Sequence, residues 1–298
     1  MKKVMNKIKL EQMRSFITLS KSLLLAISLV VFLSCANDDK QTVVNFTELV
    51  MADEFDTDGA PDSSIWDYDI GNGFDGWGNN ELQYYTDRAD NISVQNGVLL
   101  ITAKKEQFNS SSYTSARIIT KGLFEQQYGR FEARIRIPYG QGMWPAFWLL
   151  GSDCDGVGEN QESNWPDCGE IDIMEIQGQR PNIVYGAVHG PGYSGFDGNP
   201  IFKGYTLEND RFDTGFHVFG IEWGPDYINY YVDDILYNQI TPADVSEVTG
   251  DSSDWVFNKP FYIVINLAVG GTFGGTPNAE TVFPQSMLVD YVRVYKNN

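Results

Sequence analysis

Three carboxylates lie close together in the stretch "CGEIDIMEIQGQ", residues 168–179. Glu170, Asp172 and Glu175 fall within six residues of an otherwise apolar run. Clustered carboxylates repel one another, which raises the pKa of at least one of them, and a structural strand gains nothing from that arrangement. A retaining glycosidase needs such a pair, one ionised as nucleophile and one protonated as acid, about 5 to 5.5 Å apart. The alternatives are an exposed strand face without function and a calcium cage, which the flanking isoleucine and methionine side chains disfavour.

The spacing of these carboxylates is uneven for a strand. Side chains alternate between the two faces of a strand, so Glu170 and Asp172 share a face, whereas Glu175 has the wrong parity. If Met174 is an extra residue in a β-bulge, the phase shifts by one residue and Glu175 rejoins that face. The sequence therefore predicts a bulged, curved strand that presents all three carboxylates on one side.

The elements that must position this strand are themselves strands. Apolar segments of strand length alternate with Gly, Asn, Asp and Pro, and no helical period is evident. The stretch "YVDDILY", residues 231–237, predicts a hairpin with an Asp-Asp turn. Many short strands with Gly-rich turns favour a sandwich or jelly roll. The expected strands are residues 97–105, 130–138, 217–223, 227–234, 260–269 and 288–295.

The composition excludes several kinds of partner. The 298-residue chain has 40 acidic and 21 basic residues, a formal net charge of -19. That charge repels nucleic acid and anionic membrane surfaces, so a neutral or cationic partner is expected. With two histidines and three cysteines, no Cys/His metal cluster can be assembled. We expect one catalytic domain that acts as a monomer.

The N-terminal segment predicts export. Basic residues precede an apolar run from Leu23 to Leu33, which is too short to span a bilayer. The run leads into "FLSC", which resembles the lipobox of bacterial lipoproteins, with Cys35 as the lipidated residue. We expect a signal peptide over residues 1–35, a tether over 36–45 and a catalytic domain over 46–298. The expected location is the bacterial outer membrane or cell surface, reached only through the lipid anchor; a plain secretory signal is the alternative.

The sequence as a whole resembles glycoside hydrolase family 16, in its laminarinase branch, the endo-1,3-β-glucanases. The stretch "GEIDIME" is similar to the family signature, in the form with one extra residue before the last glutamate. Other stretches match in order between about residue 46 and residue 296: "DEFD", "GWGNNELQYYT", "YTSARIIT", "YGRFEARIRIP", "GMWPAFWLLG", "AVHGPG", "INLAVGG" and "MLVDYVRVY". The resemblance implies an all-β jelly-roll sandwich of two antiparallel sheets with a concave cleft for neutral β-glucan.

The resemblance also assigns roles. Glu170 corresponds to the nucleophile, Glu175 to the acid/base, and Asp172 to the residue that tunes the nucleophile and holds its protonation. The implied reaction is endo-hydrolysis of β-1,3-glucan by double displacement with retention, without a catalytic cofactor. The alternatives are a related enzyme that acts on mixed-linkage glucan or a galactan, and a non-catalytic glucan-binding jelly roll, in which the carboxylates are typically lost.

Six further residues are candidates for substrate binding, because a cleft for neutral polysaccharide needs flat aromatic platforms and hydrogen-bonding groups. They are Asn79, Arg117, Trp144, Trp148, Trp165 and His189. Asn79 and Arg117 match family positions near the substrate, although pairing with an acidic residue is the alternative for Arg117. Ordinary sandwich core is the alternative for Trp144 and Trp148, and simple packing is the alternative for His189.

The family often carries a calcium ion on the convex side, away from catalysis. The matching positions here are Glu54, the carbonyl of Gly97, and Asp290. Hard oxygen ligands from three distant segments would tie the chain ends together and stabilise the fold.

One loop differs from the usual family pattern. Residues 152–164 form a longer and more acidic connection, which is expected to overhang one end of the cleft. Cys154 and Cys168 bracket this loop, and an exported chain meets an oxidising compartment. A disulfide and two buried free thiols are both compatible with this pattern.

Overall fold

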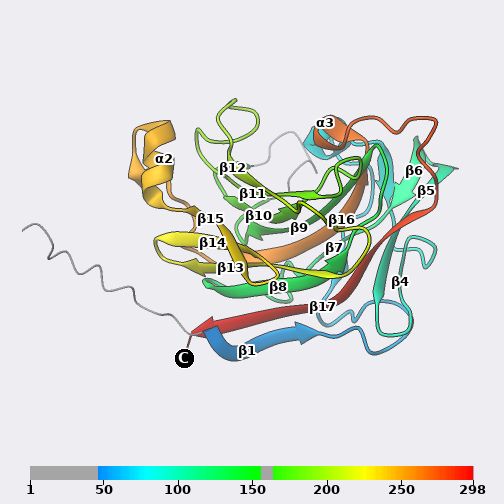
Figure 1. Cartoon of the computed structure of the whole chain (residues 1–298), viewed down its shortest axis with the longest axis horizontal. Helices are drawn as coiled ribbons and strands as arrows, with labels where there is room; N and C mark the ends of the chain where they lie inside the picture. Colours follow the sequence, from blue (N-terminus) through cyan, green and yellow to red (C-terminus); the bar gives the residue numbers. More distant parts are fainter. Residues whose placement is uncertain (1–45, 156–163, 298) are drawn as a thin grey trace, which may run out of the picture. The chain divides into compact units, whose positions relative to one another are not determined.

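The computed structural model describes residues 46–155 and 164–297. Over these ranges, a pair of β-sheets packs face to face as layers (Figure 1). The predicted all-β jelly-roll sandwich is confirmed. The proposed signal peptide, the tether and Cys35 lie outside the described residues, as does most of the acidic loop. Within the described ranges, no helix is long and apolar enough to cross a bilayer.

Ten strands make up the outer sheet. They are β1 (Phe46–Asp53), β3 (Gln83–Tyr85), β4 (Ile92–Val94), β5 (Leu99–Phe108), β6 (Ser111–Ser115), β8 (Gly129–Arg136), β13 (His217–Gly224), β14 (Tyr227–Val232), β15 (Ile235–Ile240) and β17 (Gln285–Asn297). Their order is β15-β14-β13-β8-β17-β5-β6-β3, with β1 paired to β17 and β4 to β5. The predicted hairpin joins β14 to β15, and its turn residues Asp233 and Asp234 have φ of 48° and 62°. Two positive φ values suit the twist of a two-residue hairpin turn.

Seven strands make up the inner sheet. They are β2 (Asp67–Tyr68), β7 (Arg117–Ile119), β9 (Met143–Gly151), β10 (Glu170–Glu175), β11 (Ile183–His189), β12 (Ile201–Thr206) and β16 (Phe261–Val269). Their order is β12-β11-β10-β9-β16-β7-β2, which places the carboxylate strand β10 in the interior of the sheet. Among the described strands, every neighbouring pair is antiparallel except β3 with β6, which is parallel.

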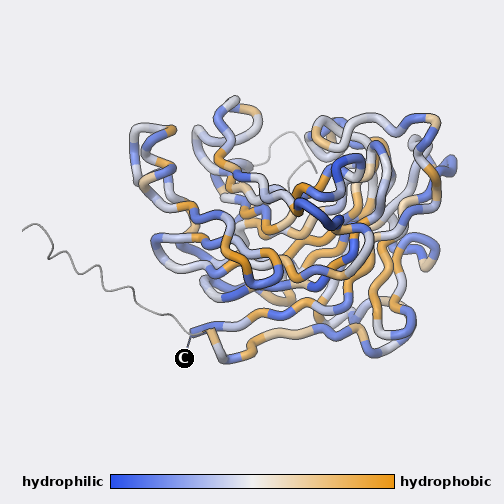
Figure 2. Tube along the Cα trace, viewed as in Figure 1, coloured by the Kyte–Doolittle hydropathy of each residue, from blue (hydrophilic) through white to orange (hydrophobic). Residues whose placement is uncertain are grey.

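The inner sheet is covered on both faces. Its core-facing side chains, such as Leu149 and Ile171, pack against the outer sheet in one large cluster. A second buried cluster lies on its other face and includes Trp148, Leu150 and Val264. Because both faces are buried, β9 and β16 are apolar almost throughout. Figure 2 shows this as orange along the strands, with blue concentrated in the loops.

The sequence did not predict helix α2 (Pro242–Thr249), so the expectation of no helix was wrong at this point. The helix is only eight residues long, too short for a clear 3.6-residue period. Its signals are local: Thr241 and Asp244 form a capping box, Pro242 begins the first turn, and Gly250 ends the helix at a φ of 85°. The other short elements are η1 (Gly76–Asn80), η2 (Ser252–Asp254) and α3 (Gly271–Gly274).

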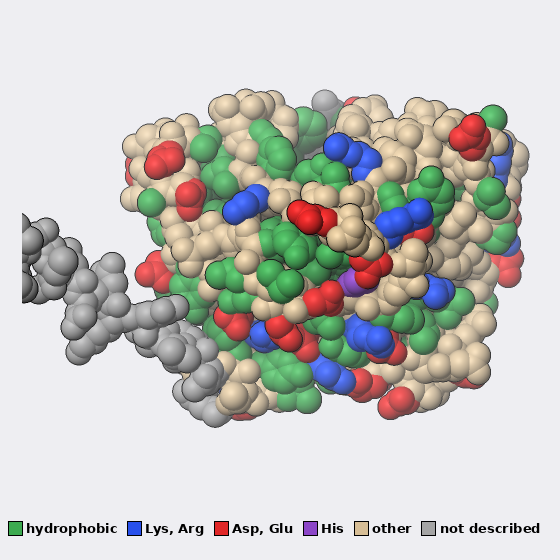
Figure 3. Space-filling model, in the orientation of Figure 1, with side chains coloured by type: hydrophobic (Ala, Val, Ile, Leu, Met, Phe, Trp, Pro, Cys, Tyr) green, Lys and Arg blue, Asp and Glu red, His purple; other side chains and the backbone are tan. Residues whose placement is uncertain are grey.

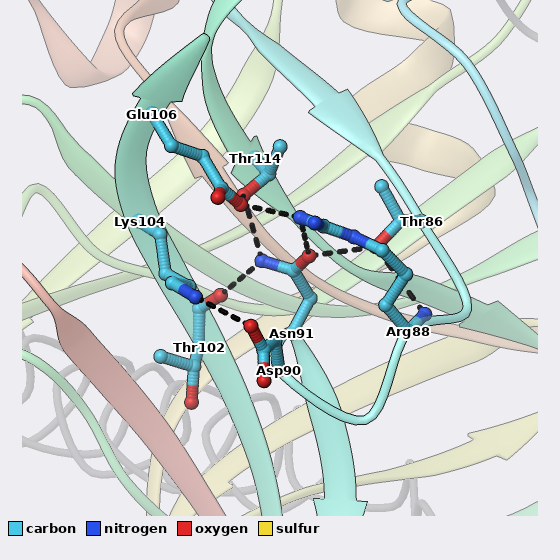
Figure 4. Close-up of polar contacts among 8 residues, drawn as sticks. All are labelled: Thr86, Arg88, Asp90, Asn91, Thr102, Lys104, Glu106 and Thr114. Carbon is cyan, nitrogen blue, oxygen red and sulfur yellow. Dashed lines mark hydrogen bonds and ion pairs between the residues drawn. The ribbon is translucent and has the colours of Figure 1, made fainter. Parts of the chain in front are cut away.

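A polar network fixes the segment between β3 and β4 (Figure 4). At its centre, the buried Asn91 side chain donates to the Thr114 hydroxyl at 2.9 Å and to the Thr102 carbonyl at 3.0 Å. Arg88 donates to Asn91 Oδ1 at 2.8 Å and pairs with Glu106. Because a buried amide left without partners is costly, this network holds in place the chain that leaves β3. It thereby supports the strand that directly follows η1 and its Asn79.

Candidate active site

The carboxylates of β10 face away from the core that lies between the two sheets. Asp172 lies opposite Trp148 on β9 and Ala187 on β11, while Glu175 lies opposite Ala146 on β9. Directly opposite residues of an antiparallel pair point to the same face. Trp148 and Ala146 belong to the second cluster, on the face of the sheet that is turned away from the core. The strand therefore presents its acids beside apolar side chains on the same face of the sheet.

The uneven spacing is resolved by a β-bulge, as expected. The register of β10 against β9 shifts between Asp172 and Met174, which leaves Ile173 without a partner on β9. On the β11 side, both Ile173 and Met174, the residue expected to be the extra one, lie between the paired residues Asp172 and Glu175. Both Ile173 and Met174 are buried in the core between the sheets. Two successive side chains on the core side allow Glu175 to return to the face of Asp172.

Each glutamate accepts a hydrogen bond from a tryptophan. Trp165 Nε1 donates to Glu170 Oε2 at 2.8 Å, and Trp144 Nε1 donates to Glu175 Oε1 at 2.8 Å. The two indoles belong to different segments, the loop before β10 and the start of β9. Each N–H fixes a carboxylate in place and favours its ionised form, because a donor stabilises the charge.

His189 completes the cluster. It lies opposite Glu170 on β11, and its Nε2 is 3.1 Å from Asp172 Oδ2 and 3.9 Å from Glu170 Oε1. Its ring also lies 5.8 Å from that of Trp165. Ligand atoms of Glu170, Asp172 and His189 lie within 4.8 Å of one another, close enough to hold a divalent cation. These are also the atoms that acid–base chemistry would use.

Burial controls the protonation of the carboxylates. It raises the pKa of Glu170 to about 8, with the charge of Asp172 as the next cause. It raises the pKa of Glu175 to about 7 and the pKa of Asp172 well above its usual range. Groups that interact this closely titrate as a unit. At neutral pH the cluster therefore carries fewer than three negative charges and holds a proton that it can transfer.

A buried hydrogen-bond chain lies on the β16 side of the carboxylates. Trp148 Nε1 donates to Asn266 Oδ1 at 2.7 Å, and Asn266 Nδ2 donates to the Tyr85 hydroxyl at 3.1 Å. The Tyr85 hydroxyl in turn donates to Glu81 Oε2 at 3.1 Å. The Asn79 side chain hydrogen-bonds the same carboxylate and lowers its pKa, although burial raises that pKa overall. Asn79 is thus linked to Trp148 through this chain of hydrogen bonds.

Arg117 lies on the same face of the inner sheet, opposite Asn266 on β16. Its guanidinium is 2.7 Å from Asp69 Oδ2, and the side chain is 4% exposed. It also lies 4.7 Å from the ring centre of Trp77 and 4.9 Å from that of Trp148. The acidic partner that the sequence offered as an alternative is therefore present. Arg117 therefore makes cation–π contacts with the rings of Trp77 and Trp148.

The three positions expected to bind calcium lie in neighbouring segments of the outer sheet. Glu54 follows β1 and Asp290 is within β17, while Gly97 lies in the turn between β4 and β5. Both carboxylate oxygens of Glu54 accept from Arg293, at 2.7 and 2.9 Å. Asp290 pairs with Arg134. An ion held by both carboxylates would have to displace Arg293 from Glu54 and Arg134 from Asp290.

The structure joins Cys154 and Cys168 in a disulfide, with Cα atoms 5.1 Å apart. Both cysteines are buried in the second cluster, beside Trp165. Asn164 also closes the loop, because its backbone N–H donates to Asp155 Oδ1 at 2.7 Å. The cross-link therefore holds the base of the loop from which Trp165 reaches Glu170.

Sequence reasoning missed three residues of this site, namely Asn266, Asp69 and Tyr85. Asn266 had a signal, since it is the one amide within the apolar stretch "PFYIVINLAV". A lone polar residue in a strand buried on both faces must have a partner, which marks it for attention. Asp69 and Tyr85 had no comparable signal, because their partners are distant in the sequence.

Comparison with known proteins agrees with this geometry. The sequence model of the glycosyl hydrolases family 16 matches residues 79–292. The chain belongs to glycosyl hydrolase family 16. A β-glucanase from Rhodothermus marinus is 42% identical over 272 residues, which cover 91% of this chain and 92% of that protein.

Solved structures of family 16 give the same result. The catalytic domain of an endo-1,3-β-glucanase (laminarinase) from Thermotoga petrophila superposes with a TM-score of 0.78 at 44% identity, covering 86% of this chain and 100% of that domain. The laminarinase from Rhodothermus marinus superposes with a TM-score of 0.76 at 43% identity, covering 84% and 98%. The resemblance to family 16 is thus confirmed, and the chain is a glycoside hydrolase.

The buried acid of Glu170 should make stability depend on pH. In the unfolded chain this group ionises near pH 4.5, whereas in the folded protein its pKa is about 8. Stability is therefore fully present below pH 4.5 and is lost as the pH rises toward 8. Glu170→Gln removes this loss, so urea unfolding should show the variant gaining about 1 to 3 kcal/mol more at alkaline than at acidic pH.

The control for that measurement is Glu125→Gln, at an exposed glutamate on the surface. Its effect on the free energy of unfolding should be the same at both pH values. Equal pH dependence of the two variants would show that burial does not raise the pKa of Glu170.

Proposed function

We propose that the chain is a retaining endo-hydrolase of β-1,3-glucan. The observation that carries this proposal is a pair of glutamates on one face of the bulged strand, each held by a tryptophan N–H at 2.8 Å. Laminarinases and β-glucanases are among the proteins that the chain resembles over most of its length. A non-catalytic glucan-binding protein is less well supported, because all three carboxylates are present and clustered.

Because the three carboxyl groups titrate as a unit, the reactive form is the one in which Glu170 is ionised and the proton lies on Glu175. In the first step, the Glu170 carboxylate attacks the anomeric carbon while Glu175 protonates the departing glycosidic oxygen. The Trp144 N–H then stabilises the carboxylate that Glu175 becomes. In the second step Glu175 accepts a proton from water, and that water breaks the ester to Glu170. Asp172 and His189 lie beside Glu170, and the negative charge of Asp172 raises the pKa of the nucleophile.

A neutral substrate fits the charges of the described residues. Sulfated galactans would need basic groups at the concave face. Arg117, on strand β7 of the same sheet, is buried and already paired with Asp69. On the face in Figure 3, acidic and basic side chains are interspersed and form no broad basic surface. These features favour a neutral glucan over an anionic one.

The roles of the two glutamates can be tested with azide and an activated aryl β-glucoside. Glu175→Ala should yield the β-glycosyl azide, because the covalent intermediate still forms and azide replaces water. Glu170→Ala should yield the α-azide, since azide then attacks the substrate directly. Both variants should lose hydrolysis of laminarin. The anomer of each product is read by NMR, and reversed anomers would exchange the two roles.

We also propose a structural calcium ion held by Glu54, the Gly97 carbonyl and Asp290. In its support, Glu54 and Asp290 have partly exposed side chains, and exposed pairs with arginine contribute only about 0 to 1 kcal/mol, so an ion can compete. A chelator should lower the melting temperature and leave turnover at low temperature near normal, because the ion acts only by binding the folded state.

Glu54→Gln is the control for the calcium proposal. This variant should lose the response of the melting temperature to calcium and to chelator. Loss of activity in the fully folded, calcium-free enzyme would contradict a purely structural role.

We propose further that the protein is an exported, monomeric lipoprotein with Cys35 as the lipidated residue. The support is the order of basic residues, apolar run and "FLSC" at the N-terminus. In a bacterial host, the chain should incorporate labelled palmitate and fractionate with membranes, whereas Cys35→Ser should do neither. An unlabelled wild-type chain in the medium would favour plain secretion.

A further inference from the structure

A row of aromatic rings runs from Glu175 to the edge of the inner sheet. The ring of Trp144, whose N–H holds Glu175, lies 5.2 Å from that of Phe273 in α3. Phe273 lies 5.6 Å from Tyr185 on β11, and Tyr185 lies 6.2 Å from Phe202 on the edge strand β12. The rings therefore form one continuous set of contacts that begins at a catalytic carboxylate.

The strand register places this row on the catalytic face. Tyr185 lies directly opposite Glu175. Phe202 lies opposite Ala187, which in turn lies opposite Asp172. Because opposite residues share a face, both rings stand on the same side of the sheet as the carboxylates. Between Phe202 and Asp172 along this register stands the small side chain of Ala187.

The edge strand is shaped to accommodate these rings. Gly204 lies opposite Tyr185, and a Cβ atom at this position would lie 3.1 Å from Tyr185 Cε1. The tyrosine ring therefore occupies space that a side chain at 204 would need. Phe202 is 56% exposed. Single exposed apolar side chains are ordinary, but this one continues a row of rings that leads to the active site.

The opposite flank of the carboxylates has another character. There, Arg117 on β7, Trp148 on β9 and Asn266 on β16 are buried and bound to protein partners. Directional, enclosed groups suit the part of a substrate whose reacting ring must be held in place. The flank toward β12 instead has the partly exposed ring of Tyr185 and the exposed ring of Phe202. Such rings offer apolar faces that sugars can cover without exact orientation.

Double displacement distinguishes these two needs. The leaving part of the glucan departs after the first step, and water must then enter where it lay, so its flank must open to solvent. The donor part stays bonded to Glu170 throughout and needs precise contacts. Building on the proposed hydrolase function, we propose that Tyr185 and Phe202 bind the leaving part of the glucan. The same surface then binds a second glucan chain as acceptor.

This site makes glycosyl transfer compete with hydrolysis. In transfer, a hydroxyl oxygen of the bound acceptor attacks the anomeric carbon and its proton passes to Glu175. The ester bond to Glu170 breaks, the carboxylate is restored, and a new glycosidic bond forms. Water and acceptor therefore react with the same intermediate, and occupancy of the aromatic row sets the ratio of their products.

The test uses the aryl β-glycoside of a β-1,3-linked glucose disaccharide as donor and the β-1,3-linked trisaccharide as acceptor. Release of the aryl group reports formation of the intermediate, and chromatography gives the ratio of transfer to hydrolysis. Phe202→Ala and Tyr185→Ala should each lower that ratio about 3- to 10-fold, as expected for loss of one aromatic contact. Aryl release should fall by a clearly smaller factor.

Ile235→Ala is the matched control, because Ile235 is 52% exposed on β15 of the outer sheet. It should leave the ratio at the wild-type value. An unchanged ratio in both aromatic variants would overturn the proposal, and so would an equal fall in aryl release and transfer, which would mean that the rings position the catalytic groups. A wild-type enzyme that releases no aryl group would instead contradict the hydrolase function itself.

Discussion

Three carboxyl groups are removed from water on one strand, and the surrounding structure depends on that constraint. Burial alone would make them neutral and inert, since the charged form is expensive without water. Two tryptophan N–H groups and one imidazole offset some of that cost for Glu170, Glu175 and Asp172. The pKa values of both glutamates remain raised, to about 8 and about 7, close to neutral pH. A proton can therefore move within the cluster at little cost, which is what acid–base catalysis needs.

Holding these donors in place requires an inner sheet that is covered on both faces. The core side anchors β10 through Ile171, Ile173 and Met174. On the other face, apolar side chains such as Ala146 and Trp148 surround the acids. The hydrogen bonds from Trp148 through Asn266 to Tyr85 fix the β16 side of this face. Burial is greatest there, and the edge strand β12 is more exposed. The two flanks of the carboxylate strand thus differ in the way that a two-step reaction with one departing group demands.

Local patterns were readable from the sequence, and contacts between distant segments were not. The strands, the Asp-Asp hairpin and the bulge follow from alternation and parity within a few residues, and family motifs supplied the roles of Glu170 and Glu175. Helix α2 was not predicted from the sequence, because eight residues are too few to show a helical period. The pair of Arg117 with Asp69 depends on how β2 and β7 meet, and the row that joins Phe273 to Phe202 depends on strand register. Neither arrangement leaves a pattern along the chain.

The bulge at Ile173 also bears on how this strand can change length during evolution. In a regular strand, two glutamates four positions apart lie on the same face. In the bulged strand, Glu170 and Glu175 are five positions apart and also share a face. The two lengths are therefore neighbouring solutions, separated by a single codon insertion whose extra side chain goes into the core. A lineage can cross between them without passing through a protein whose acid points the wrong way. The cost of that step lies in repacking a few apolar side chains, which protein cores tolerate when volume is conserved.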